Sequence, residues 1–291
     1  MRLDGNRWEQ WILDERSGGD AGVAEAITRD IREMAEGMLQ LGNLFEGGVL
    51  LDVGTGDGVI AFTALPHLGK SGRAILCDSS LGLLEHARKF AETSGVIDRC
   101  SFVVASADDL SPIANDCVDF VTTRAVLVYV ANRGKALKEF FRVLKPGGRI
   151  ILSEPIVGEL SQHYPRFTSW ELPQIKELIV RLRAFYDGIQ PASNVMMNFN
   201  EWNMVRYCEE AGFADLYLNK TIKFTSGYLK DWQALLRSSP NPFVPPLAEA
   251  LDSIFSPTER ARIEQHLRPF IEQGSDDRID SAVYVWAVKR A

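Results

Sequence analysis

The sequence Val49-Leu50-Leu51-Asp52-Val53-Gly54-Thr55-Gly56-Asp57-Gly58-Val59-Ile60 joins a short apolar run to a turn with three alternating glycines. An apolar run of this length, with β-branched residues and a glycine stop, is typical of a buried strand in a parallel sheet. The glycines allow a sharp turn and leave no Cβ where a ligand must approach the backbone. The helix that follows would present free N–H groups and the positive end of its dipole to that ligand. The alternative is a tight strand-to-helix turn that binds nothing.

The composition is that of an ordinary globular protein with an excess of acidic residues. The chain has 291 residues, 46% of them hydrophobic and 24% charged, and a formal net charge of -7. This charge disfavours a nucleic-acid partner, because binding to phosphates relies on clustered Lys and Arg. No apolar stretch is long enough to span a bilayer and no secretory signal opens the chain, so we expect no membrane partner.

The four cysteines, Cys77, Cys100, Cys117 and Cys208, are scattered without paired spacing. This pattern predicts neither disulfides nor a metal site, and it favours the reducing cytoplasm as the location. Cys77 and Cys117 lie in or beside apolar runs and are expected to be small core residues rather than reactive thiols.

Residues 7–46 are predicted to be helical with one interruption. Trp8 and Trp11 precede the break Ser17-Gly18-Gly19-Asp20, and two tryptophans ahead of a glycine hinge suit a mobile flap over a ligand. Apolar residues then recur at helical spacing from Ala21 to Leu44, which predicts a helix that packs on the core. A packing role is the alternative for the flap as well.

Short apolar strands then alternate with helical segments, which indicates βαβ units in a Rossmann-like, doubly wound α/β fold. Two later strands would complete a seven-stranded, mostly parallel sheet. We expect a single domain over 1–291, with a flap (1–46), a cofactor-binding core (47–155) and two helical cap insertions (156–200 and 227–275). The predicted strands are 49–53, 73–78, 100–105, 118–122, 149–155, 214–224 and 280–288.

Carboxylates recur where successive strands end. Asp52 and Asp57 belong to the first turn, and Asp78 ends the second strand, 20 residues beyond Gly58. A carboxylate at that place can accept hydrogen bonds from both hydroxyls of a ribose. Asp108 follows the third strand, where it can accept from an adenine amine. Each acid alone is commonly a helix cap or a solvated turn residue, but their succession at strand ends favours a nucleoside ligand.

These residues identify a resemblance to the class I S-adenosylmethionine-dependent methyltransferases, over roughly residues 45 to 155 and more loosely to the end. The first motif is 51–58, the second is Leu76-Cys77-Asp78-Ser79-Ser80, and the third is Ala107-Asp108-Asp109-Leu110. The run Phe141-Arg142-Val143-Leu144-Lys145-Pro146-Gly147-Gly148-Arg149 resembles the small-molecule branch with the ubiquinone-methylase type of core.

The resemblance implies S-adenosylmethionine as the cofactor and assigns residues to it. The glycine turn would lie against the methionine moiety, Asp78 would bind the ribose, and Asp108 would read the adenine. Arg124 would lie near the sulfonium and the methionine amine. The implied cofactor-binding set is Asp52, Gly54, Thr55, Gly56, Asp57, Gly58, Asp78, Ser79, Ser80, Ala107, Asp108 and Arg124. One departure is Ala105-Ser106 where the family has Gly-Asp, which could loosen the adenine pocket.

Two features exclude related chemistries. Val59 occupies the position of the third glycine in the dinucleotide fingerprint, which argues against a nicotinamide enzyme. The sequence Thr122-Thr123-Arg124-Ala125 stands where amine-methylating enzymes carry Asn/Asp-Pro-Pro-Tyr, so methylation of a nucleic-acid or glutamine amine is disfavoured.

We therefore predict a small-molecule methyltransferase, a monomer or homodimer, acting on an acceptor O, N or C atom of a natural-product or secondary-metabolite type. Three residues are candidates for a general base or a polar acceptor contact: Tyr129, Glu154 and His163. The alternatives are a Tyr129 packed behind the fourth strand, a structural Glu154 and a surface His163. A non-catalytic scaffold or regulator that binds the cofactor, or a protein or RNA methyltransferase, remains the alternative function.

Overall fold

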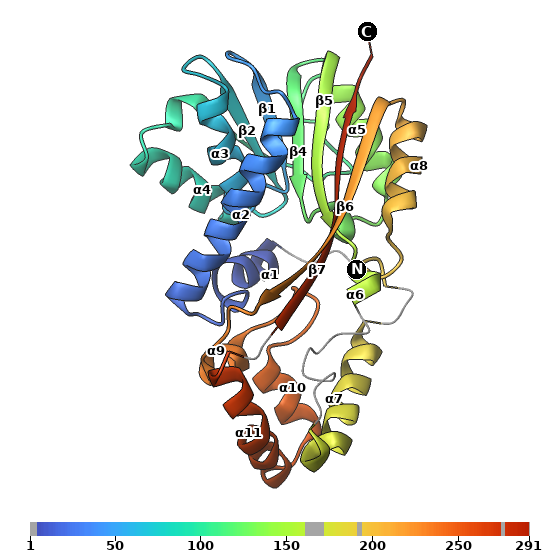
Figure 1. The fold of residues 1–291 in the computed structure, drawn as a ribbon. Coiled ribbons are helices and arrows are strands. Elements are labelled where there is room, and N and C mark those ends of the chain that lie inside the picture. The colour runs from blue at the N-terminus through green and yellow to red at the C-terminus, as the bar shows by residue number, and fades with distance from the viewer. Residues whose placement is uncertain (1–4, 161–171, 191–193, 275–276, 291) are drawn as a thin grey trace.

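The strands form one seven-stranded sheet, as the sequence predicts (Figure 1). Their order in the sheet is β3-β2-β1-β4-β5-β7-β6. The computed structural model describes residues 5–160, 172–190, 194–274 and 277–290. The first five strands are parallel, and β7 is antiparallel to both of its neighbours. Their bounds are β1 Val49–Val53, β2 Arg73–Asp78, β3 Cys100–Val104, β4 Val118–Arg124, β5 Leu144–Pro155, β6 Ala214–Ser226 and β7 Asp277–Val288.

Helices cover both faces of the sheet and bury its apolar side chains. On one face, α2 and α3 pack over Leu50 and Phe120. On the other, α5 and α8 enclose a larger core that includes Leu51 and Val121. The helices of the core are α2 Ala21–Leu41, α3 Val59–His67, α4 Leu81–Thr93, α5 Arg133–Val143 and α8 Glu201–Ala211.

The long helix α2 begins and ends for local reasons. The Asp20 side chain accepts a hydrogen bond from the Val23 N–H at 2.8 Å, which caps the first turn. The helix ends at Leu41, three residues before the predicted Leu44, because the chain turns at Gly42. A Cβ at Gly42 would lie 2.1 Å from the Cδ1 atom of Ile151, so a larger residue here would displace the Ile151 side chain of β5.

The fifth strand begins earlier than predicted. Leu144 already pairs with Val118, and the pairing then shifts so that Arg149 lies opposite Phe120. The turn between them is therefore a bulge inside β5 rather than a break before it. The Lys145 ammonium, which lies in this bulge, contacts both carboxylate oxygens of Asp119 at 2.9 Å.

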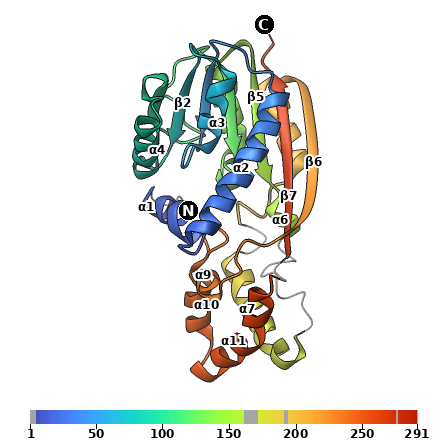
Figure 2. The ribbon, with the colours of Figure 1, turned by 60° about the vertical axis from the view of Figure 1, so that its left-hand side comes forward.

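A group of cap helices lies beyond the carboxyl ends of the parallel strands (Figures 1 and 2). They share their own apolar cluster, which includes Leu182, Trp232 and Leu267. The first helix α1 lies between the sheet and this cap (Figure 1), and the π-helical turn η1 follows it directly in the chain. The bounds are α1 Gly5–Gln10, η1 Trp11–Glu15, α6 Val157–Leu160, α7 Lys176–Ile189, α9 Trp232–Arg237, α10 Leu247–Ile254 and α11 Pro257–Glu272. None of the helices in the described ranges could cross a membrane.

Candidate cofactor and acceptor site

The glycine turn after β1 lies tightly against the loop that follows β4. Gly54 has a φ of +64°, a conformation that favours glycine. A Cβ at Gly54 would lie 2.4 Å from Cγ2 of Val126, so the two loops could not approach each other with a larger residue here. At Gly56 a Cβ would meet only Cδ1 of Ile12, at 3.4 Å, from the N-terminal segment. The turn is thus a backbone cradle that faces η1.

Asp78 ties the second strand to this cradle. Its Oδ2 atom accepts a hydrogen bond from the Gly56 N–H at 2.9 Å, and Oδ1 accepts from the Ser80 N–H at 2.9 Å. The side chain is buried, and burial raises the pKa of its carboxyl. A carboxylate has about four lone-pair sites. Both oxygens therefore keep acceptor capacity for hydroxyl groups of a ligand.

Asp52 lies inside the sheet, below the cradle. Its Oδ1 accepts from the Thr122 hydroxyl at 2.7 Å and its Oδ2 accepts from the Thr55 hydroxyl at 2.6 Å. Asp52 is 1% exposed, and this burial raises the pKa of its carboxyl to about 6. The geometry gives Asp52 and Thr55 a supporting role: they hold the turn to β4.

The remaining predicted residues lie at the ends of β2 and β3. Ser80 is buried and caps α4 by accepting from the Leu83 N–H at 3.3 Å, whereas Ser79 is exposed. Ala107 is buried, and half-buried Asp108 accepts from the Ser106 hydroxyl at 2.6 Å. Ser106, the departure from the family pattern, thus holds the carboxylate predicted to read the adenine.

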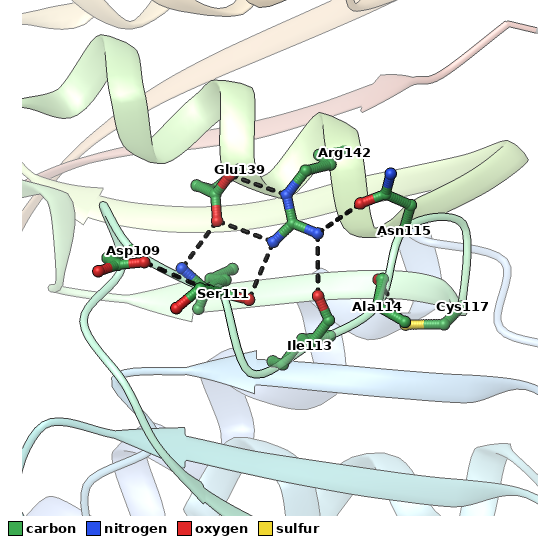
Figure 3. A network of polar contacts seen from close by, with 9 residues as sticks. Asp109, Ser111, Ile113, Ala114, Asn115, Cys117, Glu139 and Arg142 are labelled. Atoms are coloured by element: carbon green, nitrogen blue, oxygen red, sulfur yellow. Dashed lines mark hydrogen bonds and ion pairs between the residues drawn. The ribbon is translucent and has the colours of Figure 1, made fainter.

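Arg142 anchors the loop that carries Asp108 (Figure 3). Its Nη2 donates to the Leu110 carbonyl and its Nη1 donates to the Ile113 carbonyl, both at 2.9 Å. Glu139 accepts from Nε and Nη2 of Arg142 at 2.8 Å and from the Leu110 N–H at 2.8 Å. These bonds to Arg142 hold the pKa of Glu139 below its usual value. The run 141–149 therefore supports the predicted adenine loop through α5.

Glu154 is an internal acceptor for the loop after β4. It is fully buried and accepts from the Thr123 hydroxyl at 2.6 Å and from the Val128 N–H at 3.2 Å. The Val126 N–H contacts both of its oxygens, at 3.2 and 3.0 Å. Burial raises the pKa of the Glu154 carboxyl to about 7. The sequence left Glu154 open as a general base, a contact to the acceptor or a structural residue, and these contacts match the structural role.

Tyr129 is half-buried and packs against the core cluster that contains Val121 of β4, which agrees with the packed alternative. Its ring contacts Trp8 edge-on, with centroids 4.7 Å apart, and lies 5.9 Å from the ring of Phe243. Tyr129 is the last residue of the short helix η3 (Leu127–Tyr129), which follows β4. His163, the third candidate, lies outside the described residues.

The N-terminal segment is attached to the cap and to the glycine turn. The Trp11 Nε1–H donates to the Ser239 carbonyl at 2.9 Å, and the Arg7 Nε–H donates to the Pro242 carbonyl at 2.9 Å. On the other side, Nη2 of Arg16 lies 3.2 Å from Oδ2 of Asp57. Asp57, predicted to contact the cofactor, is therefore paired with this segment. No local sequence pattern marks Arg7, Arg16 or the loop 239–244, because their contacts join parts of the chain that are 41 to 237 positions apart.

A substitution at Gly18 is expected to detach this segment. Gly18 has a φ of +63°, and a Cβ there would lie 1.9 Å from the Ala234 carbonyl oxygen of α9. Because backbone cannot yield easily, Gly18→Ala should destabilise the protein by about 1–3 kcal/mol and accelerate tryptic cleavage at Arg16. The control is Gly37→Ala, since no atom lies within 4 Å of a Cβ at Gly37. Equal melting temperatures and cleavage rates for the two variants would contradict this attachment.

The strand order and the strand-end carboxylates define a Rossmann-like protein of the methyltransferase type. Residues 28–228 match the model of the ubiE/COQ5 methyltransferase family, so the chain belongs to this family. The predicted membership in the class I S-adenosylmethionine-dependent methyltransferases is confirmed, and with it the cofactor of the class.

Individual relatives agree with this assignment. The chain is 33% identical over 172 residues to the ubiquinone/menaquinone biosynthesis C-methyltransferase UbiE of Proteus mirabilis. That match covers 58% of this chain and 66% of the relative, just under two thirds of its length. A proposed methyltransferase from Bacillus halodurans shares the fold with a TM-score of 0.57 at 18% identity, covering 89% of this chain and all of that one.

One protein of the same fold carries a name that states a different activity. The [4+2]-cyclase SpnF has a TM-score of 0.52 at 17% identity, and the match covers 89% of this chain and 81% of SpnF. At this identity the likeness shows the fold alone, and the fold alone does not determine the reaction.

Proposed function

We propose that this protein transfers the methyl group of S-adenosylmethionine to a small molecule, with a ring carbon of a quinone-type acceptor as the favoured target. The observation that carries the proposal is Asp78, a buried carboxylate at the end of β2 that accepts from the Gly56 N–H of the glycine turn. The acceptor class rests on the UbiE relatives, whose name states a quinone C-methyltransferase.

The described residues fit this cofactor. The backbone cradle at Gly54 and Gly56 would hold the methionine part, Asp78 would hold the ribose, and Ala107 and Asp108 would hold the adenine. When bound, the cofactor supplies an activated methyl group on a sulfonium, and the protein accelerates the displacement by alignment and desolvation.

The N-terminal segment 1–46 is proposed to be a flap and the two helical insertions a cap. Half-buried Trp8 and Trp11 line the seam between them and would exclude water from the acceptor. Glu154 and Tyr129 are engaged in structural contacts, so we assign the general base to neither of them. The single domain, the monomer or homodimer, the cytoplasmic location and the lack of a nucleic-acid partner stay predictions from the sequence.

Calorimetric titration tests whether the protein binds the cofactor, and a labelled-methyl assay tests whether it transfers the methyl group. The protein is expected to bind S-adenosylmethionine and S-adenosylhomocysteine, and to transfer a labelled methyl group to a quinol from a cell extract. If neither compound binds, the proposed function is wrong.

The second candidate is a cofactor-binding protein that does not transfer the methyl group. It is favoured by two observations: the [4+2]-cyclase SpnF has this fold, and the two candidate bases in the described structure are occupied by structural contacts. It predicts binding of S-adenosylmethionine with no labelled product from any metabolite pool. A protein or RNA methyltransferase would instead label macromolecules in the same experiment.

A further inference from the structure

Arg124 is a cation without a counter-charge in direct contact. It is the last residue of β4, beside the glycine turn, and its side chain is half-buried. Among the residues that the structure describes, no hydrogen bond or ion pair reaches its guanidinium. Burial and the nearby charge of Arg16 both lower the pKa of Arg124. Removing a guanidinium partly from water costs free energy, unless an anion compensates its charge.

A second guanidinium comes from the N-terminal segment. Arg16 has a side chain that is 16% exposed, and its Nη2 lies 3.2 Å from Asp57 of the glycine turn. Asp57 is the only carboxylate among the described groups whose charge acts on Arg124, and the other groups are Arg16, Tyr129 and Tyr228. The cluster therefore holds two positive charges and one negative charge, drawn from the flap, the turn and the end of β4.

We propose that Arg124, assisted by Arg16, forms an anion subsite that takes a carboxylate or an ionised hydroxyl group. Guanidinium groups present planar, paired donors that match a carboxylate, and their charge repels an ammonium or sulfonium group. The subsite therefore faces an anionic group rather than the methionine amine that the family resemblance put near Arg124.

Two parts of the reacting pair could supply this anion. One is the carboxylate of the methionine tail of the cofactor, and the other is an oxyanion on the acceptor. The inference rests on the proposed function, because the cofactor is needed for both sources. Arg16 belongs to the flap, so in either case the bound anion would add a contact to the pair with Asp57 that already joins the flap to the glycine turn.

The test compares Arg124→Met with wild type, using Arg124→Lys as the conservative variant and Arg73→Met as the control. Arg73 is exposed at the amino end of β2, whereas Arg124 lies at the carboxyl end of β4. Each protein is titrated with S-adenosylhomocysteine and with 5′-methylthioadenosine, which lacks the amino-acid tail. Protein saturated with S-adenosylhomocysteine is then titrated with 2-naphthoate and with its neutral amide.

If the tail supplies the anion, Arg124→Met weakens S-adenosylhomocysteine binding by about tenfold or more and leaves 5′-methylthioadenosine unchanged. If the acceptor supplies it, the loaded wild type prefers 2-naphthoate over the amide, and Arg124→Met loses that preference. Arg124→Lys should retain part of either effect. Arg16→Met should act in the same direction, but less strongly, because Arg16 already pairs with Asp57.

Unchanged binding of all four compounds to Arg124→Met overturns the subsite. Equal weakening of S-adenosylhomocysteine and 5′-methylthioadenosine also overturns it, because that result would reflect a distorted cradle. A wild type that does not bind S-adenosylhomocysteine at all would instead overturn the proposed function.

Discussion

Replacing Asp78 by alanine is expected to weaken S-adenosylhomocysteine binding by about 100-fold or more, which corresponds to about 3 kcal/mol. The change would remove the proposed acceptor for the ribose hydroxyls and leave the N–H groups of Gly56 and Ser80 without their acceptor. Each unsatisfied buried donor costs about 1–3 kcal/mol, so the turn would also lose its fixed conformation. Calorimetric titration measures the affinity, and urea unfolding measures the stability.

The structure offers a matched control for this substitution. Asp119 is another largely buried aspartate that accepts a backbone N–H, that of Val49 at 2.9 Å, but it lies at the amino end of β4, away from the cradle. Asp119→Ala should lower the free energy of unfolding while leaving the affinity for S-adenosylhomocysteine within about threefold. Asp78→Asn keeps the side-chain volume but replaces one acceptor oxygen by an amide NH₂, which would face the N–H of Gly56 or Ser80. An intermediate loss of affinity for S-adenosylhomocysteine is therefore expected.

A loss of stability without a loss of affinity in Asp78→Ala would contradict the role proposed for Asp78. In that case Asp78 would only support the turn and α4, and a residue at another strand end would bind the ribose.

The glycine turn and the acids around it could be predicted because their signals are local. The first strand and its turn form one run of 12 residues, 49–60. Asp78 ends the second strand and Asp108 follows the third, and the apolar pattern of each strand marks it. The seven-stranded sheet follows from the alternation of strands and helices, which depends only on neighbouring segments. The end of α2 and the start of β5 were misplaced because both depend on contacts with other strands, those of Gly42 and of Leu144.

The roles of Glu154 and Tyr129 could not be predicted, because each depends on which distant group comes to meet it. Glu154 accepts hydrogen bonds from residues that are 26 to 31 positions away in the chain. Tyr129 contacts Trp8, which belongs to the N-terminal segment. The same holds for Arg16, which reaches Asp57 over 41 positions. A residue type near a strand end indicates a possible site, but its neighbours in three dimensions decide whether it faces a ligand.

Glu154→Gln is expected to change how stability depends on pH. Burial raises the pKa of Glu154 from 4.5 in the unfolded chain to about 7 in the folded protein, so the folded protein binds this proton more tightly. Its contribution to the free energy of unfolding is therefore full below about pH 4.5 and is lost as the pH rises through about 7. The loss over this window is on the order of 3 kcal/mol, at about 1.4 kcal/mol per pKa unit.

Glutamine cannot titrate, so the stability of wild type relative to Glu154→Gln should fall by this amount between pH 4.5 and pH 7.5. Asp52, whose pKa is raised to about 6, titrates in both proteins and cancels in the difference. Urea unfolding at half-unit steps of pH measures the effect, with Glu85→Gln on the exposed side of α4 as the control that should stay parallel to wild type. Glu154→Ala should be destabilised at every pH, because it leaves the Thr123 hydroxyl and two N–H groups without their acceptor. Parallel curves for wild type and Glu154→Gln would show instead that the carboxylate stays ionised, because its donors outweigh its burial.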